Sequence, residues 1–356
     1  MSKPRIIAFY LPQYHPTPNN DIWWGKGFTE WTNVGKAKPL FRGHHQPNVP
    51  SELGYYDLRL PIVREQQAQM ARDAGVEGFC YYHYWFEDGR EELDLPFKEV
   101  VASGKPDFPF CLCWANQSWE NKMWNKDGSV ISSKILCEQK YLGKEDNEKH
   151  FYSLLSALKD KRYMKVNGRP IFMIYQPMLF IGVEDFMKQW NELASKNGLE
   201  TFYFVGQCGD EAEIIPIQKM GFDALNYSQL FPFKRYKRNP LWNKIWRAFA
   251  KVPRVINYKD IMPYFNSERY KEEGIYPVII PGWDHTPRSG NRGLVYQGST
   301  PELFKEHVRQ ILDMTRGKKD NIIFLKSWNE WGEGNYMEPD LRFGRGYINA
   351  LAELVK

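Results

Sequence analysis

Short apolar runs alternate with amphipathic stretches along the chain of 356 residues. Eight runs are continuously hydrophobic, as buried strands are, and cover residues 5–11, 77–84, 109–115, 170–176, 201–207, 223–228, 276–282 and 321–328. Between them, residues 60–75, 183–198 and 300–317 are examples of helical spacing, and each ends at a glycine. Strands that alternate with helices predict a parallel sheet.

Eight parallel strands suffice to close a barrel, so the predicted fold class is α/β, a (β/α)8 TIM barrel whose last helix covers about 341–355. A doubly wound open sheet is the alternative, but LPQYHP follows the first strand where that fold would place a glycine-rich phosphate turn. Residues 12–59 and 229–275 are too long for simple connectors and predict long insertions after strands one and six. We expect a single domain over residues 1–356.

Composition narrows the class of protein. Hydrophobic residues make up 42% and charged residues 26%, which is typical of a soluble globular protein. The aromatic content is high, with 13 Trp and 21 Tyr, and these side chains can stack on sugar rings or bases. The net charge of +5 is modest and its basic residues are local, so we expect no nucleic-acid partner.

Cysteine usage and the first residues point to a reducing compartment. The five cysteines show no CxxC pair and no zinc-site spacing, which favours reduced thiols and predicts neither a metal nor a cofactor. The first apolar run is too short for a signal peptide, and no run approaches the roughly 18 residues that a membrane span needs. A cytoplasmic location is therefore expected.

Amides, imidazoles, phenols and indoles recur at the predicted strand ends, where barrel enzymes build their sites. Such groups hydrogen-bond to sugar hydroxyls and stack on sugar faces. The predicted substrate-binding residues are Tyr14, His15, Tyr82, His83, Trp114, Asn116, Gln176, Gln207, Tyr227, Trp283, Asp284, Trp328 and Asn329. At any single position the alternative is a side chain that ties down a loop, so the prediction depends on their recurrence.

The segment KSWNEWGEGNYMEPD follows the eighth strand and crowds carboxyls between tryptophans. Like charges and apolar walls change the proton affinity of a carboxyl, and glycoside hydrolysis needs one protonated carboxyl beside one carboxylate. Glu330 and Glu333 are therefore the predicted catalytic residues, whereas Glu338 is expected to be structural. The structural alternative is a pair of loop acids in ion pairs with Arg342 or Arg345.

Five segments in this order resemble the glycoside hydrolase family 99-like group over about residues 5–350: FYLPQYHP, GFTEWTNV, GFCYYHYWF, CWANQSW and SWNEWGEGNYMEP. That group includes endo-α-mannosidases, endo-α-mannanases and WbsX-like proteins encoded with bacterial surface-polysaccharide genes, some of them labelled glycosyltransferases. The resemblance implies a (β/α)8 barrel, no metal, and a retaining mechanism through a 1,2-anhydro sugar. Matched on WNEWxEG, Glu330 would deprotonate the sugar 2-hydroxyl and Glu333 would serve as acid and base at the leaving group.

The leading hypothesis is an endo-acting, retaining glycoside hydrolase whose partner is an α-mannoside-like or related bacterial oligo- or polysaccharide. One alternative is a glycosyltransferase or transglycosylase that assembles an O-antigen or capsular polysaccharide. Another is a barrel that binds carbohydrate without catalysis.

Residues 231–254 carry eight basic residues and no acidic one. After Pro240, Trp242, Trp246 and Phe249 would share one face of a helix. A basic amphipathic helix of this kind predicts peripheral contact with an anionic membrane or a glycolipid. The alternative is a lid that packs its aromatic residues on the barrel.

Overall fold

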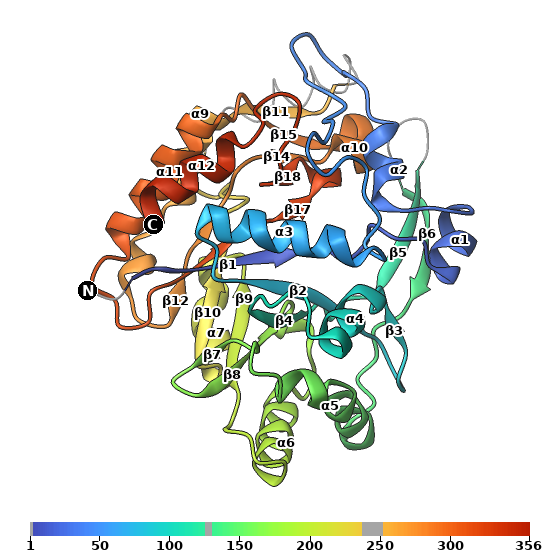
Figure 1. Cartoon of the computed structure of the whole chain (residues 1–356), viewed down its shortest axis with the longest axis vertical. Coiled ribbons are helices and arrows are strands. Elements are labelled where there is room, and N and C mark those ends of the chain that lie inside the picture. Colours follow the sequence, from blue (N-terminus) through green and yellow to red (C-terminus); the bar gives the residue numbers. More distant parts are fainter. Residues whose placement is uncertain (1–2, 125–129, 237–251) are drawn as a thin grey trace. The chain divides into compact units, whose positions relative to one another are not determined.

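The computed structural model describes residues 3–124, 130–236 and 252–356 (Figure 1). The chain divides into two compact units. We call Gly78–Tyr227 the middle unit, and Met1–Glu77 with Ser228–Lys356 the terminal unit.

The middle unit contains five parallel strands, neighbours in the order β10-β9-β8-β4-β2. Their bounds are β2 Gly78–Trp85, β4 Phe110–Trp114, β8 Arg169–Ile174, β9 Tyr203–Cys208 and β10 Ala224–Tyr227. Every residue of β2 and β4 is buried, which explains why these strands are continuously apolar. The two-residue strands β3 (Glu91–Glu92) and β7 (Lys165–Val166) pair with β2 and β8. The five strands predicted here are confirmed.

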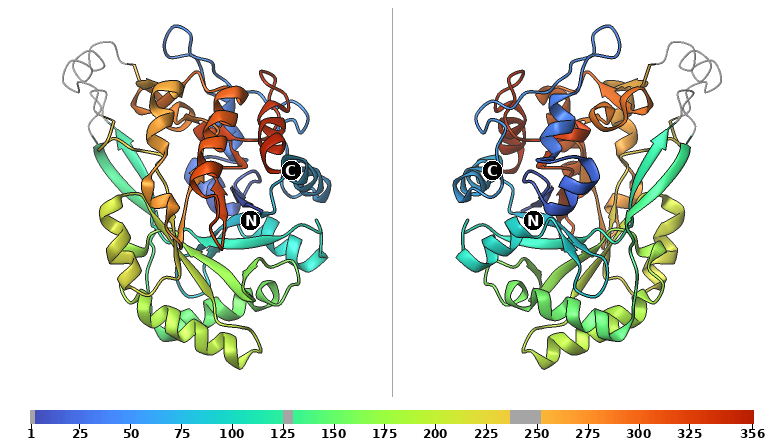
Figure 2. Two further views of the ribbon diagram at one scale, coloured as in Figure 1. Left: turned by 90° about the vertical axis from the view of Figure 1, so that its left-hand side faces the viewer. Right: turned by 90° about the vertical axis from the view of Figure 1, so that its right-hand side faces the viewer.

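Helices connect these strands. They are α4 Leu95–Ser103, α5 Lys144–Leu158, η1 Pro177–Leu179, α6 Val183–Lys196 and α7 Glu211–Lys219. α5 and α6 lie side by side (Figure 2). Trp190 of α6 is fully buried. An antiparallel hairpin that the sequence did not predict, β5 (Trp119–Trp124) and β6 (Val130–Cys137), lies between β4 and α5.

In the terminal unit, the parallel order is β1-β16-β13, with β1 Arg5–Tyr10, β16 Ile322–Leu325 and β13 Val278–Ile279. The single strand predicted at 276–282 is broken: β12 (Ile275–Tyr276) ends before Pro277 and β13 follows it. Proline has no backbone N–H to donate to a ladder, although the carbonyl oxygen of Pro277 still accepts from the N–H of Phe324 at 2.9 Å.

The helices of the terminal unit are α1 Pro18–Trp24, α2 Glu30–Gly35, α3 Pro61–Ala74, α9 Tyr258–Ile261, η2 Met262–Phe265, η3 Glu268–Lys271, α10 Thr286–Ser289, η4 Gly290–Arg292, α11 Pro301–Met314 and α12 Gly346–Val355. Pro61 begins α3, and Gly75 caps it with a φ of +83°. α11 and α12 lie side by side (Figure 1).

The last helix begins at Gly346 and not near residue 341. The carboxylate of Asp340 accepts the backbone N–H groups of Arg342 at 2.9 Å and Phe343 at 2.6 Å. These bonds hold the preceding residues in a turn, because a short acidic side chain competes with helix formation for backbone donors.

A small sheet joins one strand of the insertion that follows β10 to two strands that follow β13. β15 (Leu294–Gln297) is parallel to β11 (Arg254–Asn257) and antiparallel to β14 (Trp283–Asp284). The insertion after β1 carries α1 and α2. Strands and helices thus follow the predicted order, and the predicted fold class, a (β/α)8 barrel with long insertions after strands one and six, is confirmed.

Candidate active site

The motif that follows β16 folds into a short hairpin within the terminal unit. β17 (Asn329–Glu330) and β18 (Asn335–Tyr336) are antiparallel, and the 3-10 turn η5 (Trp331–Glu333) joins them. Gly334 ends the turn with a φ of +57°, and a Cβ at this position would lie 2.7 Å from the Cβ of Asp284. Both the backbone conformation and the close packing therefore require glycine.

Three carboxyl groups surround one guanidinium. Arg288 of α10 donates to Glu333 at 2.5 Å and to Glu330 at 3.3 Å. Its Nε donates at 2.8 Å to Glu30, the first residue of α2, which is 2% exposed. Gly332 permits this approach, since a Cβ there would lie 1.9 Å from the Oε1 of Glu30. The predicted pair is thus held by two residues that come from distant parts of the sequence.

The two carboxyls of the pair have opposite pKa shifts. Burial, and then the charge of Glu333, raise the pKa of Glu330 to about 8. Burial alone would raise the pKa of Glu333 too, but Arg288, Lys326 and His285 outweigh it and hold that pKa below its usual value. A hydrogen bond from Glu330 also lowers the pKa of Glu333. Near neutral pH, Glu330 therefore holds a proton and Glu333 is ionised.

The structural alternative predicted that Arg342 or Arg345 forms ion pairs with the two glutamates, and this prediction is wrong. Arg345 pairs with Glu52 at 2.6 Å and with Asp73 at 3.2 Å, and the guanidinium of Arg342 lies over the ring of Phe343. The cation that binds the glutamate pair is Arg288. An ion pair on both catalytic candidates is compatible with chemistry, because Arg288 changes their proton affinities unequally.

Tyr14 and Asn329, both predicted to bind substrate, are fully buried and join the first loop to the hairpin. The hydroxyl of Tyr14 donates to the carbonyl of Asn329 at 2.5 Å and accepts from the N–H of Trp331 at 3.1 Å. The side-chain amide of Asn329 exchanges hydrogen bonds with the backbone of Leu11 at 2.8 and 3.0 Å. His15 beside them is 2% exposed. These contacts position the hairpin.

Glu338 is buried among neutral donors. Its Oε2 accepts from the hydroxyl of Tyr56 at 2.9 Å and from the indole of Trp331 at 2.6 Å, and its Oε1 accepts from Gln67 at 2.6 Å. Burial raises the pKa of Glu338 to about 7, although these bonds and one from the fully buried Trp328 lower it. The contacts agree with the structural role expected for Glu338.

Asp284 is the most fully hydrogen-bonded of the predicted substrate contacts. Its carboxylate pairs with His44 at 2.7 Å and accepts from Gln46 at 2.6 Å. It also accepts from the backbone N–H and the hydroxyl of Thr286, at 2.9 and 2.6 Å. Trp283 is 6% exposed, and its indole N–H has no hydrogen-bond acceptor within the described ranges.

Comparison with known proteins decides the family. The sequence model of the glycosyltransferase WbsX family matches residues 6–351. The chain belongs to the WbsX family. It is 32% identical to the uncharacterized protein WxcX of Xanthomonas campestris pv. campestris, in each of two strains, over 98% of this chain. The chain spans about half, 49%, of the length of these curated relatives.

Solved structures show the fold of this WbsX family member. The endo-α-mannosidase of glycoside hydrolase family 99 from Bacteroides thetaiotaomicron aligns with 98% of this chain and 95% of its own, at a TM-score of 0.54 and 15% identity. A glycoside hydrolase-like protein aligns with 100% of this chain and 95% of its own, at a TM-score of 0.57 and 13% identity. This chain thus has the fold of these solved proteins, although the description of its family names a glycosyltransferase.

The remaining predicted residues lie in the middle unit, and two of them form one contact. The side-chain amide of Asn116 donates to the carbonyl of Gln176 at 3.0 Å and accepts from its N–H at 2.7 Å. The ends of β4 and β8 are joined in this way. Gln207 is half-buried, whereas Tyr82 and Tyr227 are 7% and 2% exposed.

His83 and Trp114 lie opposite each other on β2 and β4, in an aromatic cluster. The ring of His83 hydrogen-bonds to that of His150 at 2.8 Å, and burial lowers the pKa of His83 to about 3. Trp114 is 2% exposed and donates to the carbonyl of Trp85 at 2.8 Å. Both predicted sugar contacts therefore pack inside the middle unit.

Sequence reasoning missed Arg288, Glu30 and Asn335. Glu30 lies in the recognised segment GFTEWTNV, and this was the one available signal for it. Asn335 is directly opposite Glu330 in the hairpin and is fully buried, and neither atom of its amide has a hydrogen-bond partner among the described residues. Opposite residues of an antiparallel pair point to the same face, so this amide faces the same side as Glu330.

Two further observations concern metals and membranes. Within residues 3–124, 130–236 and 252–356, no group of three or more His, Cys, Asp or Glu side chains could hold a metal ion. In the same ranges, no helix is long and apolar enough to span a membrane.

Most of the basic segment 231–254 lies outside the described residues, because 237–251 are not among them. Two of its arginines are described. Arg235 donates to the carbonyl of Asn266 at 2.8 Å, and the guanidinium of Arg254 lies 3.8 Å from the ring centre of Phe233.

Proposed function

We propose that the chain cleaves glycans with retention of configuration, and that Glu330 and Glu333 carry the reaction. The observation that supports this most strongly is the setting of the pair. The buried carboxyl of Glu330 and the half-buried carboxyl of Glu333 are hydrogen-bonded to each other, and their pKa values are shifted in opposite directions. Glycoside cleavage needs one carboxyl that gives a proton and another that takes one.

In the first step, the carboxylate of Glu330 takes the proton of the sugar 2-hydroxyl, and the 2-oxygen attacks the anomeric carbon. The bond from that carbon to the leaving oxygen breaks, and Glu333 gives its proton to the leaving oxygen. The product is a 1,2-anhydro sugar. This assignment follows the resemblance of WNEWGEG to the family 99 motif.

In the second step, the carboxylate of Glu333 takes a proton from water, whose oxygen attacks the anomeric carbon. The bond from that carbon to the 2-oxygen breaks, and Glu330 returns its proton to that oxygen. Two inversions at one carbon give net retention, and both carboxyls recover their first protonation state.

The resting protonation is the reverse of what the first step needs, because Glu330 holds the proton. One transfer along the hydrogen bond between the carboxyls gives the reactive form. Arg288 opposes this transfer, since its contact with Glu333 at 2.5 Å favours the ionised form of that carboxyl. A substrate hydroxyl that draws Arg288 from Glu333 toward Glu30 would therefore activate the pair.

Asn335 is a further substrate contact in this proposal. Its buried amide faces the same side as Glu330 and has no partner among the described residues. A buried amide without a partner is unfavourable, and a sugar hydroxyl would satisfy both its donor and its acceptor.

The proposed substrate is an internal linkage of an α-mannoside-like or related bacterial polysaccharide. The fold neighbour described as an endo-α-mannosidase supports the type of linkage. The resemblance to proteins encoded with surface-polysaccharide genes supports the type of polymer. Contact of residues 231–254 with an anionic membrane or a glycolipid stays a prediction.

Glycosyl transfer is the second candidate, favoured by the description of the family as glycosyltransferase WbsX. Both reactions could use the same pair, because a sugar hydroxyl can replace water in the second step and give a transglycosylase. A transferase that uses nucleotide sugars would instead need an activated donor. The two are separated by whether a glycan is cleaved without that donor.

The deciding experiment incubates purified protein with α-mannans and bacterial surface polysaccharides, without nucleotide sugar, and follows the products by NMR. We expect oligosaccharides whose first-formed anomer matches that of the substrate. Glu330→Gln and Glu333→Gln should each slow their release by about 10²–10⁴-fold. Glu268→Gln, the same change at an exposed residue paired with Lys271, is the matched control and should leave it unchanged. Release of the opposite anomer, or sugar transfer from nucleotide sugars only, would refute the proposal.

A further inference from the structure

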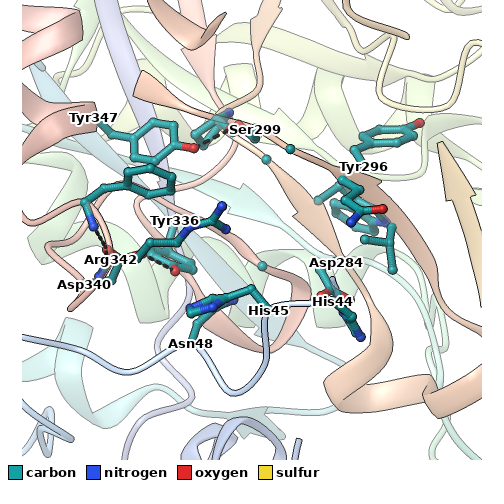
Figure 3. A pocket seen from close by; sticks show the side chains of 18 of the residues that line it. His44, His45, Asn48, Asp284, Tyr296, Ser299, Tyr336, Asp340, Arg342 and Tyr347 are labelled. Atoms are coloured by element: carbon teal, nitrogen blue, oxygen red, sulfur yellow. Dashed lines mark hydrogen bonds and ion pairs between the residues drawn. The ribbon is translucent and has the colours of Figure 1, made fainter. Parts of the chain in front are cut away.

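A cavity of about 150 Å³ lies within the terminal unit, and neither Glu330 nor Glu333 lines it (Figure 3). Its walls come from four segments, around residues 43–48, 281–284, 295–299 and 334–347. Gly334, which directly follows Glu333, forms part of the wall. The cavity is therefore next to the carboxyl pair along the chain but has its own set of side chains.

The carboxylates of this cavity are already occupied. Asp284 accepts four hydrogen bonds from His44, Gln46 and Thr286. Asp340 accepts from the hydroxyl of Tyr336 at 2.8 Å and from two backbone N–H groups at 2.9 and 2.6 Å. A ligand therefore finds few free acceptors on these carboxylates.

The donors of the cavity are free by comparison. The guanidinium of Arg342 lies 4.6 Å from the ring centre of Phe343 and has no ion pair among the described residues. His45, which lines the cavity from another segment, is exposed. Such a wall favours a ligand rich in acceptors, and Arg342 favours an anion.

Aromatic rings supply the apolar part of the site. Tyr336 lines the cavity and is supported from behind by Trp331, whose ring stacks on it at 3.8 Å. Tyr347 lies on the same side of the cavity as Arg342 (Figure 3). Sugars combine apolar C–H faces with many acceptors, so rings beside free donors match a sugar unit.

We propose that this cavity is a second glycan subsite that binds a sugar unit bearing a carboxylate or a phosphate, with Arg342 as the partner of the anion. The inference rests on the proposed function, because it adds a binding position for the same polymer. Carboxylate and phosphate share the geometry that a guanidinium binds with two hydrogen bonds.

Ligand-observed NMR tests the subsite without any turnover. The probes are a methyl glucuronide, a hexose phosphate and a neutral methyl glucoside, each titrated into the parent protein, Arg342→Gln and Arg316→Gln. Arg316 is the matched control, since it is exposed and pairs with Asp313 at 2.6 Å on another surface. We expect at least one anionic probe to bind about tenfold more tightly than the neutral one, and added salt to weaken that preference.

Arg342→Gln should remove the preference for the anion, and Arg316→Gln should keep it, while both variants melt at the parent temperature. Whichever anionic probe binds more tightly identifies the anion. Equal binding of all three probes, or a preference that survives in Arg342→Gln, would overturn the inference. Glu330→Gln separates the two proposals, because it should lose cleavage and keep anion binding. Retained cleavage would count against the proposed function, and lost anion binding would count against the subsite.

Discussion

Glu338 and the pair Glu330 and Glu333 belong to one short motif and are all buried or nearly so, yet their surroundings differ in kind. Glu338 accepts from neutral groups that are themselves fixed, the hydroxyl of Tyr56 and the indole of Trp331 among them. The pair instead shares a proton and one guanidinium. Fixed neutral donors hold a carboxyl in one orientation, whereas a shared proton can move. Burial alone does not distinguish a structural carboxyl from a reactive one.

Removal of either member of the pair should have the largest effect. Glu330→Gln and Glu333→Gln should each lower the rate of glycan cleavage by about 10²–10⁴-fold, because each removes a group that transfers a proton. An aryl glycoside with a good leaving group should partly rescue Glu333→Gln and not Glu330→Gln. If the aryl glycoside rescued only Glu330→Gln, then Glu330 would be the acid at the leaving group and Glu333 the base. The resting protonation, with the proton on Glu330, is compatible with that exchange of roles.

The next effect concerns Arg288. Arg288→Met should destabilise the fold by roughly 3–5 kcal/mol, because it leaves Glu30 buried without its cation. It should also raise the pKa of Glu333 and move the acidic limb of the pH–rate profile to higher pH. Urea melts and the pH–rate profile measure the two effects, with Arg288→Lys as the conservative control. An unchanged profile would contradict the proposed influence of Arg288 on the pair.

Glu338→Gln should lose stability and keep its catalytic rate, in contrast to substitutions in the pair. Its new amide group faces donors that have lost an acceptor, so we expect a loss of stability of about 1–3 kcal/mol. The catalytic rate of the folded fraction and its pH dependence should change little. A rate loss as large as that of Glu330→Gln, at full stability, would end the distinction between the two kinds of carboxyl.

The pH dependence of stability has a smaller effect. The folded protein keeps the Glu330 proton up to about pH 8, whereas an ordinary glutamate loses it near 4.5. Between these values the folded state binds more protons than the unfolded state, so stability falls as pH rises, by at most about 1.4 kcal/mol per pH unit. The raised pKa of Glu338 contributes to the same fall in stability, up to about pH 7. Urea melts at pH 7 and pH 8 should therefore differ less in Glu330→Gln than in the parent.

The smallest expected effect belongs to Asn335. Asn335→Ala removes no hydrogen bond to the described residues, so its melting temperature should stay close to that of the parent. We expect kcat/KM to fall about tenfold, because the sugar loses an amide contact. Binding of the same glycan to Glu330→Gln with and without the alanine checks this. Equal affinity, with equal turnover in the parent background, would show that the amide does not contact substrate.

The order of the strands could be predicted from the sequence because continuous apolar runs and glycine-ended helices are local patterns. Breaks such as the one at Pro277, and the start of α12 at Gly346, depend on single residues within those patterns. The extra hairpin β5–β6 mixes apolar and polar residues and has no continuous apolar run of strand length to reveal it. That residues 1–356 act as one domain stays a prediction.

The carboxyl pair could be predicted because both members lie in one motif. Arg288 and Glu30 could not, since the contact between them joins segments 258 residues apart. His83 and Trp114 show the reverse: residues with sugar-binding chemistry at strand ends can also pack as a buried cluster. Residue type and strand position therefore do not separate a ligand contact from a packed core.

The position of the shared proton is the central claim, and its measurement needs no substrate. Protein labelled with ¹³C at the glutamate carboxyl carbons should show, in its NMR titration, one carboxyl with a midpoint near pH 8. That titration should be absent in Glu330→Gln and present in Glu338→Gln. A spectrum in which no carboxyl titrates near pH 8, or in which that midpoint survives in Glu330→Gln, would contradict the account.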